Sequence, residues 1–259
     1  MATALVTGAT SGIGAAFVRA LARRGWDLVL VARDEGRLEE VAEGCRAQGR
    51  RVEVLRADLT DRGDVDRVAA RLEDASAPVD LLVNNAGFSV GASLLSTDQA
   101  AHDRAFEVML RAVQVLSGAA GRAMTARGRG RIVNVGSTAG RITMGAYSAI
   151  KAWVTVYTEG LANELSGTGV TAMALEPGWV RTEFHERAGI TGSSMPSVLW
   201  LDADELVEGA LKDLSRGRVV STPSLRYKGL MLVARHAPRA GIRWVSKALS
   251  DRRSSSLPE

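Results

Sequence analysis

Tyr147 and Lys151 stand four residues apart in a stretch, 147–165, whose pattern predicts a helix, so their side chains share one face. A free tyrosine has a pKa of about 10, which is too high for a base at neutral pH. A nearby ammonium favours the phenolate, which can take a proton from an alcohol, and the phenol can give one to a carbonyl. Taken alone, such a pair is more often a surface pair, so the surrounding sequence has to distinguish the two interpretations.

A glycine-rich turn near the N-terminus indicates a phosphate site. Residues 7–14 read TGATSGIG and lie between an apolar run, 3–7, and a predicted helix, 12–24. Gly8 permits the tight turn, and Gly12 and Gly14 let the backbone approach a pyrophosphate. The helix N-terminus then offers free N–H groups and a partial positive charge. The alternative is a strand–helix turn that is merely rich in glycine.

The elements that must hold these groups alternate between strand and helix. Near-continuous apolar strands are typical of a sheet covered on both faces, so the pattern predicts an α/β fold with a doubly wound parallel sheet. Ligands then bind at the carboxyl ends of the strands. The predicted strands are 3–7, 27–32, 51–56, 79–83, 131–135, 169–175 and 218–221, and the predicted helices are 12–24, 34–48, 61–75, 98–126, 147–165 and 202–216.

The spacing of the turn, TGxxxGxG, resembles that of the short-chain dehydrogenase/reductase family. Other motifs of that family follow in order over residues 3–185, and the ordered set is far more specific than any one motif. They are Asp58 and Leu59 after the third strand, NNAG at 84–87, Ser137 after the fifth strand, YSAIK at 147–151, PG at 177–178, and Thr182.

The resemblance implies a single-domain Rossmann-like sheet of about seven strands flanked by helices, in an oxidoreductase that interconverts a carbonyl and a secondary alcohol. Ser137 would hydrogen-bond the substrate oxygen, Tyr147 would move the proton, and Lys151 would also hold the nicotinamide ribose. A homodimer or homotetramer through the long helices is expected. The cofactor-binding residues implied are Gly8, Thr10, Ser11, Gly12, Ile13, Gly14, Asp58, Leu59, Asn85, Ala86, Gly87, Tyr147, Lys151, Pro177, Gly178, Val180 and Thr182.

The residue after the second strand favours NADP(H) over NAD(H). An acidic residue there would accept hydrogen bonds from the ribose and repel a 2′-phosphate, whereas Arg33 does the opposite. The segment ARDEGRL, 32–38, resembles the NADP-preferring branch of the family, and Arg37 is placed to help. Asp34 could bind a ribose instead, but it fits better as a helix N-cap.

Two features depart from the family pattern. Ser137 and Tyr147 are ten residues apart, a short gap that we interpret as a trimmed loop over the substrate. Met109 stands where many members place an asparagine that helps to hold a water in the proton relay, and a thioether cannot orient a water as an amide does. We predict a working enzyme with an altered relay; the alternative is a dinucleotide-binding regulator or scaffold with weak activity.

Residues 179–201 resemble the variable substrate loop and favour a lipophilic ketone or alcohol over a sugar, because apolar side chains can line an apolar cleft. The alternative is that several of them cover the core. The candidates are Trp179, Phe184, His185, Ile190, Met195, Leu199 and Trp200, with Phe88 and Met144.

The composition excludes several classes of protein. Cys45 is the single cysteine, so no internal disulfide forms, and we expect it to be a half-buried helix residue in a reducing compartment. The N-terminus lacks the basic region of a signal peptide, and no run of about 18 apolar residues occurs, so a cytoplasmic protein is expected. His102, His185 and His236 are scattered, which predicts no metal site.

The C-terminal residues 222–259 are predicted to form a basic amphipathic extension of a catalytic domain, 1–221. Residues 221–259 hold eight basic residues against two acidic ones, although the net charge of the chain is only +4. We favour a helix packed on the body or on a neighbouring subunit; the alternative is peripheral membrane contact through this tail. The charge lacks a recognition motif, so no nucleic-acid partner is predicted.

Overall fold

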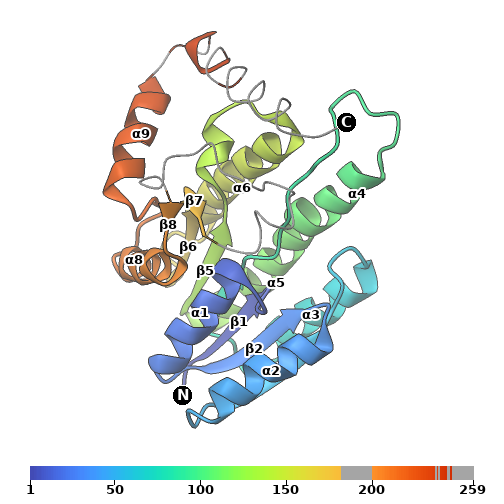
Figure 1. Cartoon of the computed structure of the whole chain (residues 1–259). Helices are drawn as coiled ribbons and strands as arrows, with labels where there is room; N and C mark the ends of the chain where they lie inside the picture. The colour runs from blue at the N-terminus through green and yellow to red at the C-terminus, as the bar shows by residue number, and fades with distance from the viewer. Residues whose placement is uncertain (182–199, 237, 239, 244–245, 247–259) are drawn as a thin grey trace.

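The computed structural model describes residues 1–181, 200–236, 238, 240–243 and 246. Its core is a seven-stranded sheet in the order β3-β2-β1-β4-β5-β6-β9, in which every neighbouring pair is parallel (Figure 1). The predicted fold class is confirmed. The strands are β1 Thr3–Thr7, β2 Asp27–Ala32, β3 Val52–Arg56, β4 Leu81–Asn84, β5 Gly130–Val135, β6 Val170–Leu175 and β9 Val220–Ser221.

Helices cover both faces of the sheet, as the continuous apolar strands require. The helices α1 Gly12–Arg23, α2 Glu35–Arg46 and α8 Ala203–Ser215 pack on one face, and α3 Arg62–Glu73, α5 Ala112–Arg127 and α6 Gly145–Glu164 pack on the other. Successive strand residues point to opposite faces, so Leu5 and Val6 of β1 lie in different core clusters. Apart from α5, the sequence bounds and observed bounds of these elements agree within two residues.

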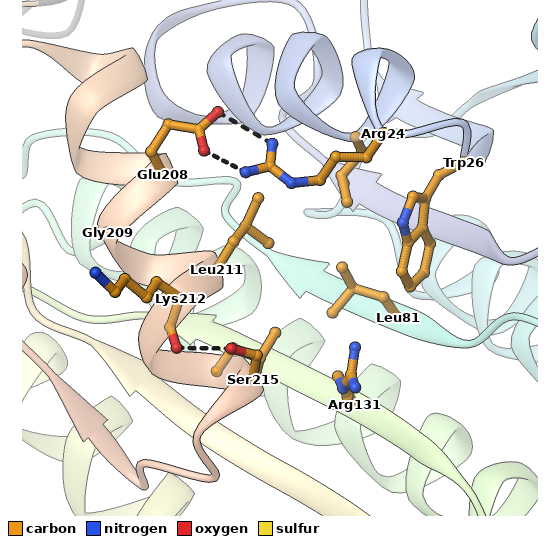
Figure 2. A pocket seen from close by; sticks show the side chains of 11 residues that line it. Arg24, Trp26, Leu81, Arg131, Glu208, Gly209, Leu211, Lys212 and Ser215 are labelled. Atoms are coloured by element: carbon orange, nitrogen blue, oxygen red, sulfur yellow. Dashed lines mark hydrogen bonds and ion pairs between the residues drawn. The ribbon is translucent and has the colours of Figure 1, made fainter.

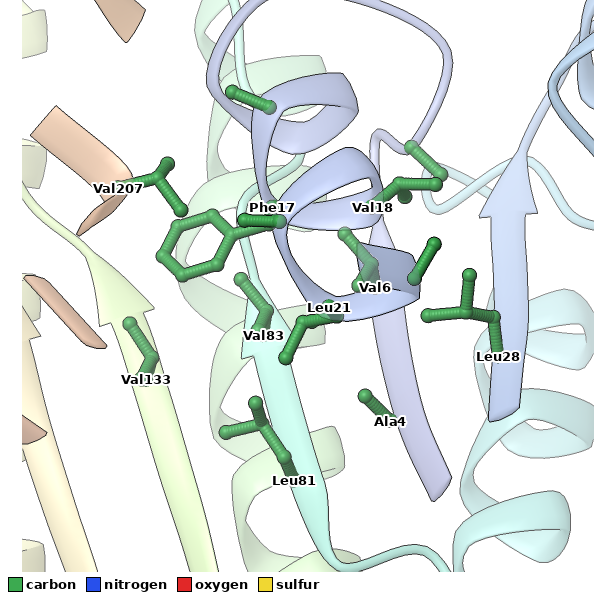
Figure 3. Close-up of a cluster of buried hydrophobic side chains, with 14 of the residues drawn as sticks. Ala4, Val6, Phe17, Val18, Leu21, Leu28, Leu81, Val83, Val133 and Val207 are labelled. Carbon is green, nitrogen blue, oxygen red and sulfur yellow. The ribbon is translucent and has the colours of Figure 1, made fainter. Parts of the chain in front are cut away.

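The first core cluster fixes the helix that begins at the glycine-rich turn. Phe17 and Leu21 of α1 lie over the sheet, with Val207 of α8 beside them (Figure 3). Phe17 is fully buried, which contributes roughly 1.5–3 kcal/mol relative to an exposed side chain. The N-terminus of α1 is thereby held at the carboxyl edge of the sheet.

Aspartates cap three of the helices. Asp34 accepts a hydrogen bond from the backbone N–H of Arg37 at 3.1 Å, so its predicted role as an N-cap is confirmed. Asp61 begins α3 and Asp202 begins α8 in the same way. Each cap fixes the residue at which the preceding loop ends and the helix begins.

The prediction of one long α-helix over 98–126 is wrong in one respect. The segment consists of α4 Ala100–Phe106, a π-helical turn Glu107–Arg111 and then α5. The backbone N–H of Ala112 donates to the carbonyl of Glu107, five residues back. A π turn adds one residue to a helical turn, and the change in apolar spacing is too small for the turn to be recognised in the sequence. Such turns occur frequently at functional sites. Met109 lies inside it.

The described part of the C-terminal extension packs on the body of the protein. The extension begins with α9 Leu225–His236, near the 3₁₀ turn Thr138–Arg141. Tyr227, Ile242 and Ser246 are buried, and the Ser246 hydroxyl accepts a hydrogen bond from the backbone N–H of Thr143 at 3.0 Å. These contacts support the packed interpretation, and the division at residue 221 stays a prediction. Among the described helices, none is both long and apolar enough to cross a membrane.

Candidate active site

Lys151 lies on α6 beneath the carboxyl ends of β4 and β5. Its side chain is buried, and its Nζ donates a hydrogen bond to the carbonyl oxygen of Val135 at 2.8 Å. Burial lowers the pKa of Lys151 to about 8, because the ammonium has lost its hydration. The same Nζ lies 5.6 Å from the centre of the Tyr147 ring.

Tyr147 is one turn earlier on α6, so the predicted shared face brings the two groups together. Burial raises the pKa of Tyr147 to about 12, and a hydrogen bond with Ser137 lowers it in part. The ammonium of Lys151 is expected to lower the pKa of Tyr147, but this influence is smaller than the increase in pKa that desolvation causes. In the protein itself, the phenol therefore holds its proton at neutral pH and is set up as a proton donor.

Ser137 follows β5 and is buried beside this pair. Its hydroxyl oxygen accepts a hydrogen bond from the backbone N–H of Ala139 at 3.1 Å and so caps the 3₁₀ turn Thr138–Arg141. This turn and Met144 occupy most of the short gap before α6, which begins at Gly145 with a φ of 68°. The trimmed loop thus keeps Ser137 within reach of Tyr147.

The glycine-rich turn offers a site for phosphates at the start of α1. Ser11 is the N-cap residue but makes no side-chain capping bond, so the first N–H groups of the helix are left for another acceptor. Thr10, Ser11 and Ile13 are half-buried around the turn. Gly8 and Gly12 have φ values of 64° and 54°, in the left-handed region that favours glycine.

The NNAG segment closes this turn against the sheet. The side-chain amide of Asn85 donates to the carbonyl oxygens of Thr7 and Gly8 at 3.0 and 3.2 Å. The Thr7 hydroxyl accepts from the backbone N–H groups of Asn85 and Ala86 at 3.0 and 3.1 Å. A Cβ on Gly14 would lie 2.1 Å from the Gly8 carbonyl oxygen. The cradle has no room for a side chain here, and its residues fit a dinucleotide.

The groups expected around the adenosine lie at the ends of β2 and β3. Arg33 directly follows β2 and is exposed. The Asp58 carboxylate accepts hydrogen bonds from the Thr60 backbone N–H and hydroxyl at 3.0 and 2.8 Å, and Leu59 is buried. Asp58 therefore shapes the turn after β3. Because β2 and β3 are parallel neighbours, this turn lies at the same carboxyl edge of the sheet as Arg33.

The PG segment after β6 is tied to the Ser137 side of the site. The backbone N–H and hydroxyl of Thr138 both donate to the Pro177 carbonyl oxygen, at 3.0 and 3.2 Å. Gly178 is packed by Tyr227, whose ring lies 2.1 Å from where a Cβ would stand. Val180 is buried, and Thr182 lies outside the described residues.

Met109 reaches the centre of the site, as its place in the sequence predicts. It is buried, and a Cβ on Gly87 would lie 3.2 Å from its Sδ and 3.7 Å from the Lys151 Nζ. The thioether of Met109 and the ammonium of Lys151 therefore both lie close to Gly87 of the NNAG segment. Its effect on the proton relay stays a prediction.

The substrate side of the site is only partly described. Trp179 of β7 Trp179–Val180 and Trp200 of β8 Trp200–Leu201 lie edge to face, with ring centres 5.8 Å apart. Phe88 is half-buried against the core, as the alternative interpretation expects, and Met144 is half-buried at the start of α6. Phe184, His185, Ile190, Met195 and Leu199 lie outside the described residues.

Other groups considered in the sequence lie away from this site. Cys45 lies in α2 but is buried in the first core cluster and not half-buried as expected, and burial raises the pKa of its thiol. A cleft of about 560 Å³ opens at the amino ends of β4 and β5, where Arg24 and Glu208 form an ion pair near Trp26 (Figure 2). That is the opposite edge of the sheet from Tyr147. In the part of the chain that the structure describes, no cluster of potential metal ligands occurs.

Sequence reasoning missed three residues that support the site. Tyr227 packs on Gly178, and its hydroxyl accepts a hydrogen bond from the backbone N–H of Trp179 at 3.0 Å. Glu176 is buried, and Arg141 forms an ion pair with it. No local pattern identifies these contacts, although a charged residue directly after an apolar strand, as at Glu176, is a signal worth testing.

The fold and the site define a dinucleotide-binding α/β protein whose serine, tyrosine and lysine converge beside the glycine-rich turn. Residues 2–191 match the family model described as short chain dehydrogenase, and the chain belongs to that family. It is 41% identical over 189 residues to the galactitol 2-dehydrogenase (L-tagatose-forming) of Cereibacter sphaeroides, which covers 70% of this chain and 72% of the relative.

Two solved structures extend the similarity over the whole chain. One is a short-chain dehydrogenase from Sphingobium yanoikuyae in complex with NADPH, with a TM-score of 0.81, 35% identity, and coverage of 100% of this chain and 97% of the other. The second is a bulky-bulky ketone specific alcohol dehydrogenase from Comamonas testosteroni, with a TM-score of 0.78, 30% identity, and coverage of 100% and 96%.

Proposed function

We propose that this short-chain dehydrogenase reduces a lipophilic ketone to a secondary alcohol with NADPH, reversibly. The observation that carries the proposal is the half-buried phenol of Tyr147, which is hydrogen-bonded to Ser137 and lies beside Lys151. A phenol whose pKa is raised to about 12 keeps its proton until a stronger base forms next to it. The alkoxide that develops when a ketone accepts a hydride is such a base.

Each residue of the site has a part in the proton transfer. Bound NADPH supplies the hydride. Ser137 donates a hydrogen bond to the ketone oxygen and stabilises the charge that develops there. Tyr147 gives its proton to that oxygen, and Lys151, a neighbouring cation, stabilises the phenolate that is left until solvent returns the proton. In the direction of oxidation, the same phenolate would take the proton of the alcohol.

The preference for NADP(H) rests on Arg33. Its guanidinium is exposed at the carboxyl end of β2, where the ribose of a dinucleotide lies in folds of this kind. Asp34, the acidic alternative, is occupied as the N-cap of α2. The relative from Sphingobium yanoikuyae binds NADPH, which supports the same choice.

The experiment compares binding of NADPH and NADH by calorimetry on the wild type and on Arg33→Ala. We expect tight NADPH binding that Arg33→Ala weakens by about tenfold or more, since a charge-assisted hydrogen bond contributes roughly 1.5–3 kcal/mol. NADH binding should change little. Arg46→Ala is the matched control, because Arg46 is the last residue of α2, at the other end of this helix from Arg33, and pairs with Glu39 at 2.8 Å. No binding of either cofactor would overturn the proposal, whereas binding without turnover of any carbonyl compound would favour the alternative of a dinucleotide-binding scaffold.

A lipophilic substrate is supported by the aromatic side chains beside the PG segment. Trp179 and Trp200 are half-buried on that side, and the Comamonas testosteroni relative is named for bulky ketones. A panel of carbonyl compounds assayed with NADPH tests this expectation. Turnover of small polar carbonyls alone would contradict it.

We also infer an oligomer formed through α5 and α6. Val156 on α6 is 67% exposed, and Trp153 and Tyr157 stack on the same helix with ring centres 4.7 Å apart. An apolar face of this kind suits a second copy of the chain. Size-exclusion chromatography with light scattering tests it, and a clean monomer would contradict it.

Membrane contact through the tail is the less favoured alternative. Three residues of the tail are buried against the body of the protein. They are Tyr227, in the first turn of α9, and Ile242 and Ser246, after this helix. Sedimentation of the full chain and of a 1–224 truncation with anionic vesicles distinguishes the two interpretations. Equal behaviour of the two proteins would remove the membrane alternative.

A further inference from the structure

We propose that the ion pair of Arg141 with the buried carboxylate of Glu176 positions Ser137 for the proton transfer, an inference that rests on the proposed function. Glu176 directly follows β6 and is 2% exposed. Its Oε1 accepts a hydrogen bond from the Arg141 Nε at 3.1 Å and forms an ion pair with the Arg141 Nη2 at 2.8 Å. Arg141 is the last residue of the 3₁₀ turn that Ser137 caps. The pair therefore fixes the far end of the turn that carries the catalytic hydroxyl.

The near end of the same turn, at Thr138, is fixed to Pro177, the residue after Glu176. Thr138 donates two hydrogen bonds to the carbonyl oxygen of Pro177, and the backbone N–H of Gly136 donates to Leu175 at 2.8 Å. Residues 136–141 are thus held along residues 175–177 from one end to the other. Since Ser137 lies between the two fixed points, its hydroxyl has little freedom to move away from Tyr147.

The carboxylate of Glu176 also contacts the catalytic helix. The hydroxyl of Thr155 donates to the same Oε1 at 2.9 Å, and Thr155 is one helical turn after Lys151. A Cβ on Gly140 would lie 2.7 Å from the backbone nitrogen of Ala152, so the turn touches the backbone of α6 directly. One buried oxygen atom therefore joins the Ser137 turn, α6 and the segment that leads to the PG motif.

A buried carboxylate is stable only while it is paired and hydrogen-bonded. Loss of the Arg141 guanidinium leaves Glu176 with a single donor, and the far end of the turn loses its connection to the residue that follows β6. Ser137 would then move relative to Tyr147, and misplacement of a reacting group by about 1 Å can reduce a rate about 100-fold. Glu176 and Arg141 are positioning residues, because neither one touches the reacting atoms.

The first readout does not depend on activity. The chain has three tyrosines, so protein labelled with [¹³Cζ]tyrosine gives three signals, and Tyr147→Phe identifies that of Tyr147. Ser137→Ala removes the hydrogen bond and should shift the Tyr147 signal. We expect Arg141→Met to shift it in the same direction, and Arg141→Lys to restore much of the wild-type position. This result is obtainable even if no substrate is turned over, so it separates the inference from the proposed function.

The second readout is kinetic, with NADPH and a ketone from the substrate panel. We expect Arg141→Met and Glu176→Gln to lower kcat by about tenfold or more, with the dissociation constant of NADPH within about twofold of the wild type. Arg51→Met is the matched control, since Arg51 pairs with the buried Asp27 at 2.8 Å at the opposite edge of the sheet. It should lower the melting temperature without changing kcat or the Tyr147 signal.

Two results would overturn the inference. One is a Tyr147 signal that Ser137→Ala shifts but neither Arg141→Met nor Glu176→Gln shifts. The other is a loss of kcat in Arg51→Met equal to that in the two site variants, because the pair would then act only on global stability. If Arg141→Met does not fold, Arg141→Lys and Glu176→Gln keep part of the hydrogen bonding and decide between the same outcomes.

Discussion

The ammonium of Lys151 lies 5.6 Å from the centre of the Tyr147 ring and is buried against the carbonyl oxygen of Val135. Burial pushes both groups toward their neutral forms, with the pKa of Lys151 lowered to about 8 and that of Tyr147 raised to about 12. Under the proposed function this arrangement suits proton donation to a ketone, and the burial of the ammonium is costly for the stability of the fold. Two of the predictions below follow from this relationship.

Lys151→Met should show the cost of the buried ammonium in the pH dependence of stability. The pKa of Lys151 is lower in the folded protein than its ordinary value of 10.5, so the unfolded chain binds more protons between pH 8 and 10.5. Wild-type stability thus rises with pH in this range and is lost as the pH falls toward 8. Relative to the variant, the free energy of unfolding should gain about 1.4 kcal/mol per pH unit.

Urea unfolding of both proteins at several pH values between 8 and 10 measures this difference. Tyr147 does not interfere, because it is protonated in both states below about pH 10. At pH 7 the free energy of unfolding should be higher for Lys151→Met than for the wild type, because the variant buries no ammonium. Its turnover should be lost. Parallel curves for the two proteins across the range would show that the ammonium is not destabilising.

Tyr147→Phe should abolish most of the turnover and leave cofactor binding intact. The substitution removes only the phenolic oxygen, and general acid–base catalysis contributes roughly 10²–10⁴-fold to a rate. We therefore expect kcat to fall at least about 100-fold, with unchanged NADPH affinity by calorimetry. Intact turnover in this variant would assign the proton transfer to another group.

Gly14→Ala should weaken both the fold and the cofactor site. Its Cβ would lie 2.1 Å from the Gly8 carbonyl oxygen, so backbone in the glycine-rich turn must move. Gly44→Ala in α2 is the control, because nothing lies within 4 Å of the added atom, and it should stabilise the helix by about 0.5–1 kcal/mol. Thermal unfolding and NADPH binding of the two variants test whether Gly14→Ala is destabilised and Gly44→Ala is stabilised. A stable Gly14→Ala protein that binds NADPH normally would refute the predicted close approach.

Met109→Leu should be nearly neutral. Met109 is buried beside Gly87 and cannot orient a water as an amide does, so its contribution is packing. A swap of similar volume should change the free energy of unfolding by less than about 1.5 kcal/mol and leave kcat as it is. Steady-state kinetics decide, and a large loss of kcat would mean that the thioether takes part in the reaction.

Much of the fold could be predicted because local patterns encode it. Continuous apolar runs specify strands that are buried on two faces, and the positions of Asp34 and Gly128 mark where helices begin and end. The π turn around Met109 could not be predicted, because it depends on how the helix packs on the sheet. The placement of the tail could not be predicted for the same reason, and contacts such as Ser246 with Thr143 support the packed interpretation.

The sequence by itself determined the order of the elements and the identity of Ser137, Tyr147, Lys151 and the glycine-rich turn, since these depend on residue type and spacing along the chain. Tertiary structure decided which protonation states burial favours and which distant residues meet. Arg141 reaches Glu176 across 35 positions, and Tyr227 reaches Trp179 across 48. Desolvation and long-range pairing depend on what packs around a group, and spacing in the sequence carries no information about that.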